Sequence, residues 1–315
     1  MNEVSVLINS NKSGQYMARQ PLIALAGQPN MGKSTIFNLL TGLNQHVGNW
    51  PGKTVEHREG TFELDGQSVH LVDLPGTYSL TANSPEEIIT REFILREKPD
   101  LVIAVVSAAN LERSLYLVSE LVALPSPLIV ALNMMDVAEQ EGLRVESHVL
   151  EAALGVPVIA TTATHAEGIN ALLKSAEQGI SGKLAFKPRV PDIRADHREL
   201  LDQVISEIKG FVPEPYPTEW AALKILEGDS DINTKIESAL PLERWEAVQT
   251  LLKGHDDALL AIASGRYAWI ERMVHAAVFR PRIGQISLTD RLDRWATHPV
   301  WGLFILAGIL AAVFG

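Results

Sequence analysis

Hydrophobic residues follow two different periods in the first half of the chain. Some stretches are uninterrupted apolar runs, typical of strands buried on both faces of a sheet, and others repeat at three and four positions, typical of amphipathic helices. Because strands and helices alternate, we predict an α/β fold with a doubly wound sheet and ligands at the carboxyl ends of its strands. The runs are Leu22–Ala26, Leu101–Val106, Leu128–Leu132 and Val156–Ala160, and the helical stretches are Ser34–Leu40, Ser84–Lys98 and Leu111–Leu124.

Two further patterns lie between the first and second apolar runs. Gly60–Leu64 and Ser68–Val72 flank the dipeptide Asp65-Gly66, an arrangement typical of a β-hairpin. Thr41–His57 is interrupted by glycines and a proline, so we expect a long loop there. Long loops inside compact domains are often functional.

Only helical periodicity continues after Ile180–Val190, which contains glycine, proline and basic residues and which we interpret as a linker. From His197 to Met273, apolar residues repeat at helical spacing, so we predict a small all-helical domain with its tryptophans in the core. Val300–Phe314 is apolar throughout but shorter than the roughly twenty residues that cross a bilayer. We interpret it as the start of a transmembrane helix, with a buried terminal helix as the alternative.

The amino-acid composition excludes several classes of function and kinds of site. The chain has 315 residues and a net charge of −11, so it is long enough for two domains and non-specific nucleic-acid binding is disfavoured. It has no cysteine, which excludes disulfides, thiolate nucleophiles and thiolate metal sites. The first twenty residues lack the layout of a signal peptide. We interpret them as a polar leader, with an ordered strand around Val4–Ile8 as the alternative.

The junction of the first strand and helix carries a phosphate-binding pattern. Gly27, Gly32, Lys33 and Ser34 fit G-x-x-x-x-G-K-[ST], with a strand before it and a helix after it. The glycines let the backbone curl so that its N–H groups point at phosphate oxygens, and the helix adds its positive dipole end. Lys33 can reach the β- and γ-phosphates, and Ser34 offers a hydroxyl to Mg²⁺.

Three residues farther along fit a nucleoside triphosphate site. Thr54 lies in the long loop and could bring a second hydroxyl to Mg²⁺ and its N–H to the γ-phosphate, although a surface threonine is an equal alternative. Asp73 follows the second hairpin strand and could hold a Mg²⁺-bound water. Gly76 can give its N–H to the γ-phosphate without a side-chain clash.

The segment after Leu128–Leu132 indicates recognition of guanine. The Asp136 carboxylate can accept hydrogen bonds from N1–H and the N2 amine of guanine, whereas adenine would leave it unpaired. Asn133 would connect this loop to the phosphate loop. An ordinary turn is the alternative interpretation of Asn-x-x-Asp after a strand.

Together these motifs resemble the five ordered motifs of a GTPase domain. They are G-Q-P-N-M-G-K-S, Thr54, D-L-P-G, N-M-M-D and T-T-A. In detail, N-W-P-G-K-T-V-E and D-L-P-G-T-Y-S-L resemble the ferrous iron transport protein B (FeoB) family, and the resemblance extends from Leu22 to the C-terminus. It implies a P-loop GTPase, a helical domain that couples it to the membrane and tunes GDP release, and the start of a transmembrane helix.

The resemblance also implies the site residues. Catalysis would involve Lys33, Asn30, Thr54 and Gly76, with Mg²⁺ held by Ser34, Thr54 and Asp73, and with K⁺ held beside the phosphates by Asn30. An alternative is that Asn30 only stiffens the loop. The residues implied to bind GTP or GDP are Gly27, Gln28, Pro29, Asn30, Met31, Gly32, Lys33, Ser34, Thr35, Gly52, Lys53, Thr54, Val55, Glu56, Asp73, Leu74, Pro75, Gly76, Asn133, Met134, Met135, Asp136, Thr161, Thr162 and Ala163.

Four positions depart from the expected motifs. Lys53 stands where the family has an apolar residue, Met134 stands where most GTPases have lysine, and Ala166 replaces a glycine of the last motif. Thr77 occupies the position of the glutamine that orients water in Ras-like enzymes. Slow hydrolysis, with water positioned largely by the backbone, is therefore implied.

The expected domain order combines pattern and resemblance. It is a polar leader (1–20), a GTPase domain (21–180), a linker (181–190), a helical domain (191–280), an amphipathic juxtamembrane segment (281–299) and a truncated transmembrane helix (300–315). Arginines before the apolar run place the first two domains in the cytoplasm, at the inner membrane, by the positive-inside rule.

The resemblance implies Fe²⁺, small cytoplasmic Feo proteins and further copies of the chain as partners, and no nucleic acid. Three alternatives remain. A soluble GTPase of ribosome assembly or tRNA modification would carry a basic RNA-binding module, which the acidic charge disfavours. A non-hydrolysing nucleotide switch would bind GTP without turnover. An adenine-preferring nucleotidase would favour ATP over GTP.

Overall fold

The computed structural model describes residues 19–51, 53–184, 186–193, 195–255 and 257–280. The expectations for residues 1–18, for Gly52, and for the amphipathic and transmembrane segments at 281–315 lie outside these residues. Within the described part of the chain, no helix is both long and apolar enough to cross a membrane.

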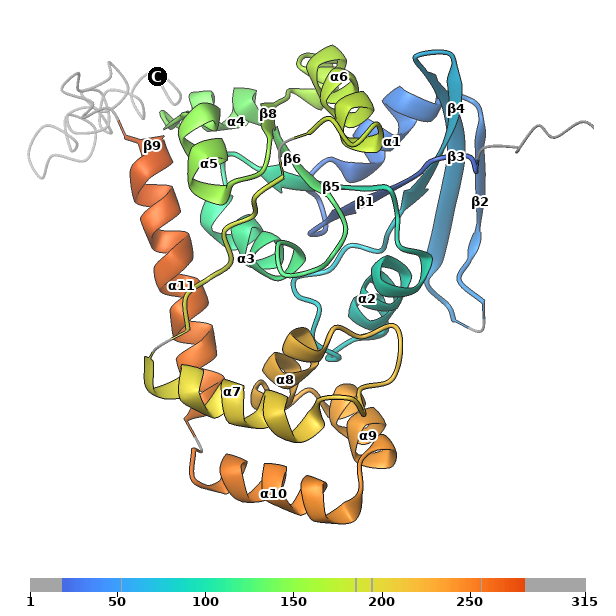
Figure 1. Ribbon diagram of the computed structural model, residues 1–315. Coiled ribbons are helices and arrows are strands. Elements are labelled where there is room, and N and C mark those ends of the chain that lie inside the picture. The colour runs from blue at the N-terminus through green and yellow to red at the C-terminus, as the bar shows by residue number, and fades with distance from the viewer. Residues whose placement is uncertain (1–18, 52, 185, 194, 256, 281–315) are drawn as a thin grey trace, which may run out of the picture.

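A seven-stranded mixed sheet forms the first domain, in the order β2-β3-β4-β1-β5-β6-β8 (Figure 1). β1, β4, β5, β6 and β8 run parallel, as expected for a doubly wound sheet, and β2 and β3 add antiparallel neighbours. The strands are β1 (Leu22–Gly27), β2 (Gln45–Asn49), β3 (Glu56–Leu64), β4 (Gln67–Asp73), β5 (Leu101–Ser107), β6 (Leu128–Asn133) and β8 (Val158–Ala160).

Helices cover both faces of this sheet. Side chains of β5 alternate between two cores: Leu101, Ile103 and Val105 face one, and Val102 and Val106 face the other. The first domain's helices are α1 (Lys33–Thr41), α2 (Pro85–Glu97), α3 (Leu111–Leu121), α4 (Met135–Gln140), α5 (Ser147–Leu154) and α6 (Ile169–Ile180), with a 3-10 turn at Ala163–His165.

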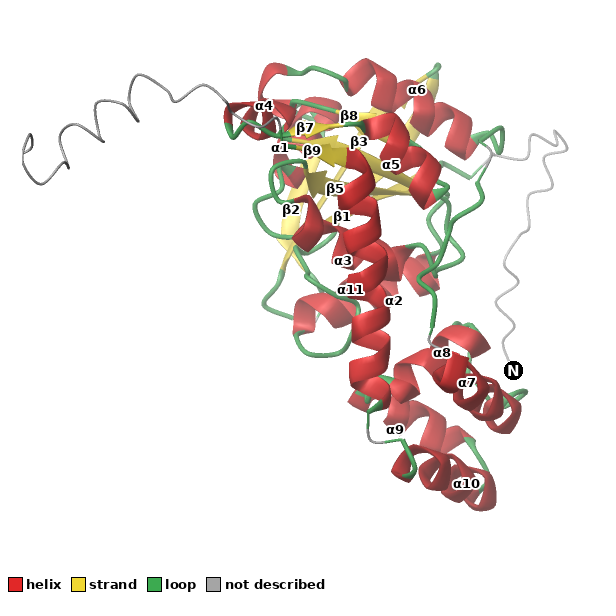
Figure 2. Cartoon of the chain, turned by 90° about the vertical axis from the view of Figure 1, so that its left-hand side faces the viewer, coloured by secondary structure: helices red, strands yellow, loops and turns green. Residues whose placement is uncertain are grey.

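The second region is helical, as predicted. α7, α8, α9 and α10 gather at one end of the molecule, and α11 returns along α3 and α5 to the sheet domain (Figures 1 and 2). Trp220, Trp245 and Trp269 are buried, in agreement with the prediction. The elements are α7 (Ala195–Ile208), α8 (Thr218–Leu226), α9 (Ser230–Ala239), α10 (Leu242–Lys253) and α11 (Ala258–Ala277), and the short strand β9 (Val278–Phe279) then pairs with β7 (Arg144–Val145).

The prediction of one long loop at Thr41–His57 was wrong in part. Gln45–Asn49 forms the edge strand β2, paired with β3, although its side chains are mostly exposed. An exposed edge strand has no buried face to impose an apolar alternation, so its sequence resembles that of a loop. The hairpin at Asp65-Gly66 and the N-terminal cap of α2 at Ser84 are confirmed.

Candidate nucleotide site

The phosphate loop joins β1 to α1 at the carboxyl end of the sheet. Gly32 caps α1 with φ of 87°, a left-handed conformation that glycine adopts without strain. A Cβ atom at Gly32 would lie 2.2 Å from Asn133 Nδ2, so no other residue fits there. The sequence pattern and the backbone therefore agree at this position.

Lys33 and Asp73 meet beside this loop. Lys33 Nζ lies 3.0 Å from Asp73 Oδ1, and their side chains are only 10% and 7% exposed. Together with Ser34 and Gly76 they line a cavity of about 240 Å³, which we call the phosphate cavity. In this state Lys33 is paired with a carboxylate, and it must turn away from Asp73 to reach a phosphate.

The oxygen atoms that line the same cavity are suitable ligands for Mg²⁺. Asp73 Oδ1 is buried and makes no hydrogen bond of good geometry in the described structure, and Ser34 adds a hydroxyl. Hard oxygen donors of this kind, few in number, suit Mg²⁺, which takes its remaining ligands from phosphates and water. Among the described residues no group of three or more His, Cys, Asp or Glu could form an all-protein metal site.

Asn133 connects the loops as expected. Its Nδ2 donates to the backbone oxygen of Met31 at 3.0 Å. Its Oδ1 accepts from the Ala163 amide at 3.0 Å and from the Thr161 hydroxyl at 3.3 Å. One buried amide thereby fixes the phosphate loop, the Asn-x-x-Asp segment and the Thr161–Ala163 segment relative to one another.

A second cavity, of about 530 Å³, is lined by Met135, Asp136 and Thr162. All three are among the residues predicted to bind the nucleotide. Met134 and Ala166 both have positive φ, 63° and 56°, which is uncommon outside glycine. Ala166 thus adopts a left-handed conformation that glycine would reach without strain.

Other predicted residues lie apart from these two cavities. Thr54, Lys53 and Asn30 are exposed, and none of them lines the phosphate cavity, whereas Val55 and Glu56 do. Gln28 is buried, and its Nε2 donates to the Arg113 backbone oxygen at 2.6 Å. Pro29 packs against Gly76, Met31 is buried, Thr35 is half-buried, and Leu74 and Pro75 line the phosphate cavity.

Trp50 holds the loop of Thr54 in this position. Its backbone N–H donates to the Val55 oxygen at 2.9 Å, which closes a turn around Thr54. Its ring centroid lies 4.3 Å from that of His57 and 5.6 Å from that of Phe93 on α2. In this turn Thr54 is exposed and does not line the cavity that contains Lys33 and Asp73.

Arg58 and Glu86 also line the phosphate cavity, and the sequence analysis missed both. A signal for Arg58 was present. The two-residue turn at Asp65-Gly66 fixes the hairpin register, and that register places Arg58 opposite Asp73. Glu86, in the first turn of α2, carried no comparable signal.

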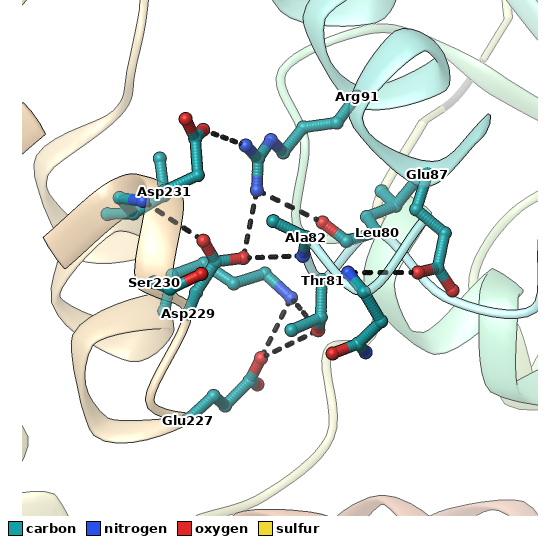
Figure 3. A network of polar contacts seen from close by, with 12 residues as sticks. Leu80, Thr81, Ala82, Glu87, Arg91, Glu227, Asp229, Ser230 and Asp231 are labelled. Atoms are coloured by element: carbon teal, nitrogen blue, oxygen red, sulfur yellow. Dashed lines mark hydrogen bonds and ion pairs between the residues drawn. The ribbon is translucent and has the colours of Figure 1, made fainter. Parts of the chain in front are cut away.

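The segment after Gly76 is bound to the helical domain by buried polar contacts (Figure 3). Ala82 N–H donates to Asp229, at the start of α9, at 2.9 Å. Leu80 N–H donates to Glu120 of α3, within the first domain, at 2.7 Å. Lys224 Nζ, on α8, donates to the Thr81 hydroxyl at 3.0 Å. A segment beside the phosphate cavity therefore cannot shift far without changing contacts to α8 and α9.

Lys224 is one of four buried charged side chains that pair with one another. Lys224 Nζ lies 3.1 Å from Glu120 and 2.8 Å from Glu227, and Arg266 pairs with both acids. Burial alone would raise the pKa of Glu120, but the charges of Lys224 and Arg266 outweigh it and lower that pKa. Burial likewise opposes the charge on Lys224 and Arg266, yet the two glutamates raise both pKa values. Glu120, Lys224 and Arg266 are therefore ionised near neutral pH.

Comparisons with known proteins agree with this architecture. Residues 22–176 match the family model described as ferrous iron transport protein B, and residues 197–278 match the FeoB cytosolic helical domain. A Shigella flexneri protein named Fe(2+) transporter FeoB is 41% identical over 302 residues, covering 93% of this chain and 38% of that protein. A Porphyromonas gingivalis Fe(2+) transport protein A/Fe(2+) transporter FeoB fusion protein is 34% identical over 302 residues, covering 90% of this chain and 35% of that protein.

A solved structure is similar in three dimensions. The GDP-bound structure of a mutant S. thermophilus NFeoB has a TM-score of 0.75 and 32% identity, and the match covers 82% of this chain and all of that one. The chain spans well under half the length of the two relatives above.

Proposed function

Since the chain belongs to the ferrous iron transport protein B (FeoB) family, with its N-terminal GTPase domain and cytosolic helical domain, we propose that it binds GTP with Mg²⁺ and hydrolyses it slowly. One observation supports the proposal. Lys33 and Asp73 line one cavity, and Asn133 connects the phosphate loop to the second cavity, which Asp136 lines. The P-loop GTPase fold supports the activity.

We assign the following roles to this chain's residues. Lys33 turns from Asp73 to the β- and γ-phosphates, and Asp136 accepts the guanine N–H groups. Ser34, Thr54 and Asp73 would hold Mg²⁺, which would supply positive charge to neutralise the phosphates. Thr54 joins them only after the Trp50 turn opens. Gly76 gives its N–H to the γ-phosphate.

Slow turnover and a role for K⁺ are parts of the proposal that rest on individual residues. Thr77 is buried, its N–H donates to the Gly27 oxygen at 3.2 Å, and it carries no amide to orient water. Asn30, exposed at the phosphate loop with φ of 65°, would hold K⁺ beside the phosphates. A bound cation there would act as an arginine finger does.

Phosphate release from GTP by the whole chain, in KCl and in NaCl, tests this function, with Asn30→Ala alongside. We expect K⁺-stimulated release that Asn30→Ala loses. Equal slow rates in both salts would leave Asn30 a structural role. Tight GTP binding without any turnover would instead indicate a non-hydrolysing switch. Competition between GTP and ATP tests the base preference assigned to Asp136.

We propose further that the chain regulates or drives Fe²⁺ uptake by a membrane transporter, with both domains on the cytoplasmic side. The domain limits at residues 180 and 191 belong to this proposal, as do membrane attachment through 281–315 and oligomer formation. Interaction with small Feo proteins is supported by the fusion of a Fe(2+) transport protein A to FeoB in Porphyromonas gingivalis. Iron uptake by cells that carry the complete protein, with and without Lys33→Ala, is the corresponding test.

A further inference from the structure

A second cation faces the phosphate cavity from the hairpin. Arg58, on β3, stands directly opposite Asp73 of β4 in the antiparallel ladder. It lines the cavity that Lys33 and Ser34 line, and its side chain is 32% exposed. Among the described residues around that cavity, only Lys33 and Arg58 carry a positive charge.

Arg58 is held at rest by a neighbour on its own strand. Its Nε donates to Glu56 Oε1 at 2.7 Å, and Glu56 lines the same cavity. Chiefly this hydrogen bond, with a smaller contribution from Asp73, raises the pKa of Arg58, so the guanidinium stays charged. A partly exposed ion pair is weak, and Arg58 can exchange Glu56 for a stronger acceptor at low cost.

A triphosphate would bring such an acceptor. Charge spreads over the γ-phosphoryl oxygens during hydrolysis, and a guanidinium offers them paired donors in a fixed plane. Thr77 cannot supply paired donors of this kind, and Lys33, the other cationic side chain of the cavity lining, is a single ammonium group assigned to both the β- and γ-phosphates. We propose that Arg58 leaves Glu56 and stabilises the transferring γ-phosphoryl group from within the same chain, a role that rests on the GTPase function proposed above.

The chemical step keeps Arg58 a cation throughout. The water oxygen forms a bond to the γ-phosphorus while the bond from that phosphorus to the β-phosphate oxygen breaks. GDP leaves with the electron pair, and the proton lost by the water is taken up by the released phosphate. Arg58 contributes only hydrogen bonds and charge, so it should act on the transition state more than on bound GDP.

Two substitutions and a matched control test this role in the full chain. Arg58→Gln removes the charge, and Arg58→Lys keeps it without the paired donors. Arg96→Gln is the control, because Arg96 Nε also donates to a glutamate of its own element, Glu92, at 2.7 Å, and neither residue lines the cavity. Thermal unfolding of each variant checks that it folds.

Kinetics and nucleotide binding together distinguish stabilisation of the transition state from binding of the ground state. For Arg58→Gln we expect kcat to fall at least about tenfold with KM changed less than about threefold, and Arg58→Lys to recover part of the loss. Fluorescent GDP should bind all variants equally, whereas its tightening by aluminium fluoride should disappear in Arg58→Gln only. Arg96→Gln should match the unsubstituted chain in both assays.

Other results would overturn the role of Arg58. Unchanged kcat and unchanged tightening by aluminium fluoride in Arg58→Gln would exclude it, although the unsubstituted chain still hydrolysed GTP. An equal loss in Glu56→Gln would mean that the ion pair itself matters rather than the freed guanidinium. A lack of GTP turnover by the unsubstituted chain would instead count against the GTPase function, and the aluminium fluoride assay would then decide on Arg58 separately.

Discussion

Arg91 Nη1, on α2, donates to Asp229 Oδ2 at 2.9 Å, and neither side chain is exposed to solvent. Asp229 also caps α9 by accepting the Ile232 N–H at 3.0 Å, and it accepts the Ala82 N–H (Figure 3). One carboxylate therefore joins the sheet domain, the segment after the phosphate cavity and the helical domain.

Asp229→Ala should destabilise the protein strongly. It removes one of the two aspartates that pair with the buried Arg91, the other being Asp231, and it removes a helix cap. We therefore expect a loss of about 2–4 kcal/mol in the free energy of unfolding. Urea unfolding measures this, with exposed Glu237→Ala on the same helix as a control that should stay within about 0.5 kcal/mol. A loss below about 1 kcal/mol would mean that Asp229 is not a structural link between the domains.

Acid should weaken the same interface through Glu120. Its folded pKa lies below the ordinary value of about 4.3, so its ionised form contributes stability above that pH and loses it as the pH falls through the folded pKa. Lys224, with a raised pKa, keeps its contribution up to about pH 10. The unfolding free energy should be level from about pH 5 upward and fall below about pH 4.

Urea unfolding between pH 3 and pH 7 checks this behaviour. In Glu120→Gln the decline below pH 4 should become shallower, by up to about 1.4 kcal/mol per pH unit, even though the variant starts from lower stability. Glu92, whose pKa is also lowered, keeps part of the slope. Identical slopes in both chains would show that Glu120 does not titrate as its surroundings imply.

Helices and strands could be predicted where the apolar residues follow a single period, either that of a helix or that of a strand. Leu101–Ser107 is buried at every position and was expected as a strand. β2 and the short helices α4 and α5 were missed, because an exposed edge strand and a short helix are stabilised by their neighbours rather than by their own pattern. α6 was missed too, although its buried apolar residues Ile169, Leu172 and Ala176 repeat at helical spacing. The buried charges of Lys224 and Arg266 were also beyond prediction, since burial of a charge depends on partners distant in sequence.

The site was more predictable than the fold around it, because phosphate chemistry fixes residue types and spacing. Lys33, Asp73 and Asn133 lie together as the motifs imply. Thr54 does not lie with them, since the hydrogen bond from the Trp50 N–H to the Val55 oxygen closes a turn that keeps Thr54 out of the cavity lining. Arg58 required the register of a hairpin rather than a motif.

Ala166→Gly should stabilise the protein. Ala166 has φ of 56° in the turn between Thr162 and Glu167, and glycine adopts that conformation without steric cost. We expect a gain of about 0.5–1 kcal/mol, measured as a higher urea midpoint. Ala109→Gly, at a loop position without positive φ, should be destabilising and is the control. A loss of stability in Ala166→Gly equal to that of the control would show that Ala166 is not strained.

Phe93→Ala should favour GTP over GDP. Phe93 contacts Trp50, whose turn keeps Thr54 from the phosphate cavity, and an aromatic pair contributes about 0.5–1.5 kcal/mol. Losing about 1 kcal/mol from the closed turn raises the fraction of open chains about fivefold and tightens GTP binding by the same factor. GDP has no γ-phosphate for Thr54, so its affinity should not change. Fluorescent-nucleotide titration measures both, with half-buried Phe211→Ala as the control, and equal tightening of GTP and GDP would exclude a specific role of the Trp50 turn.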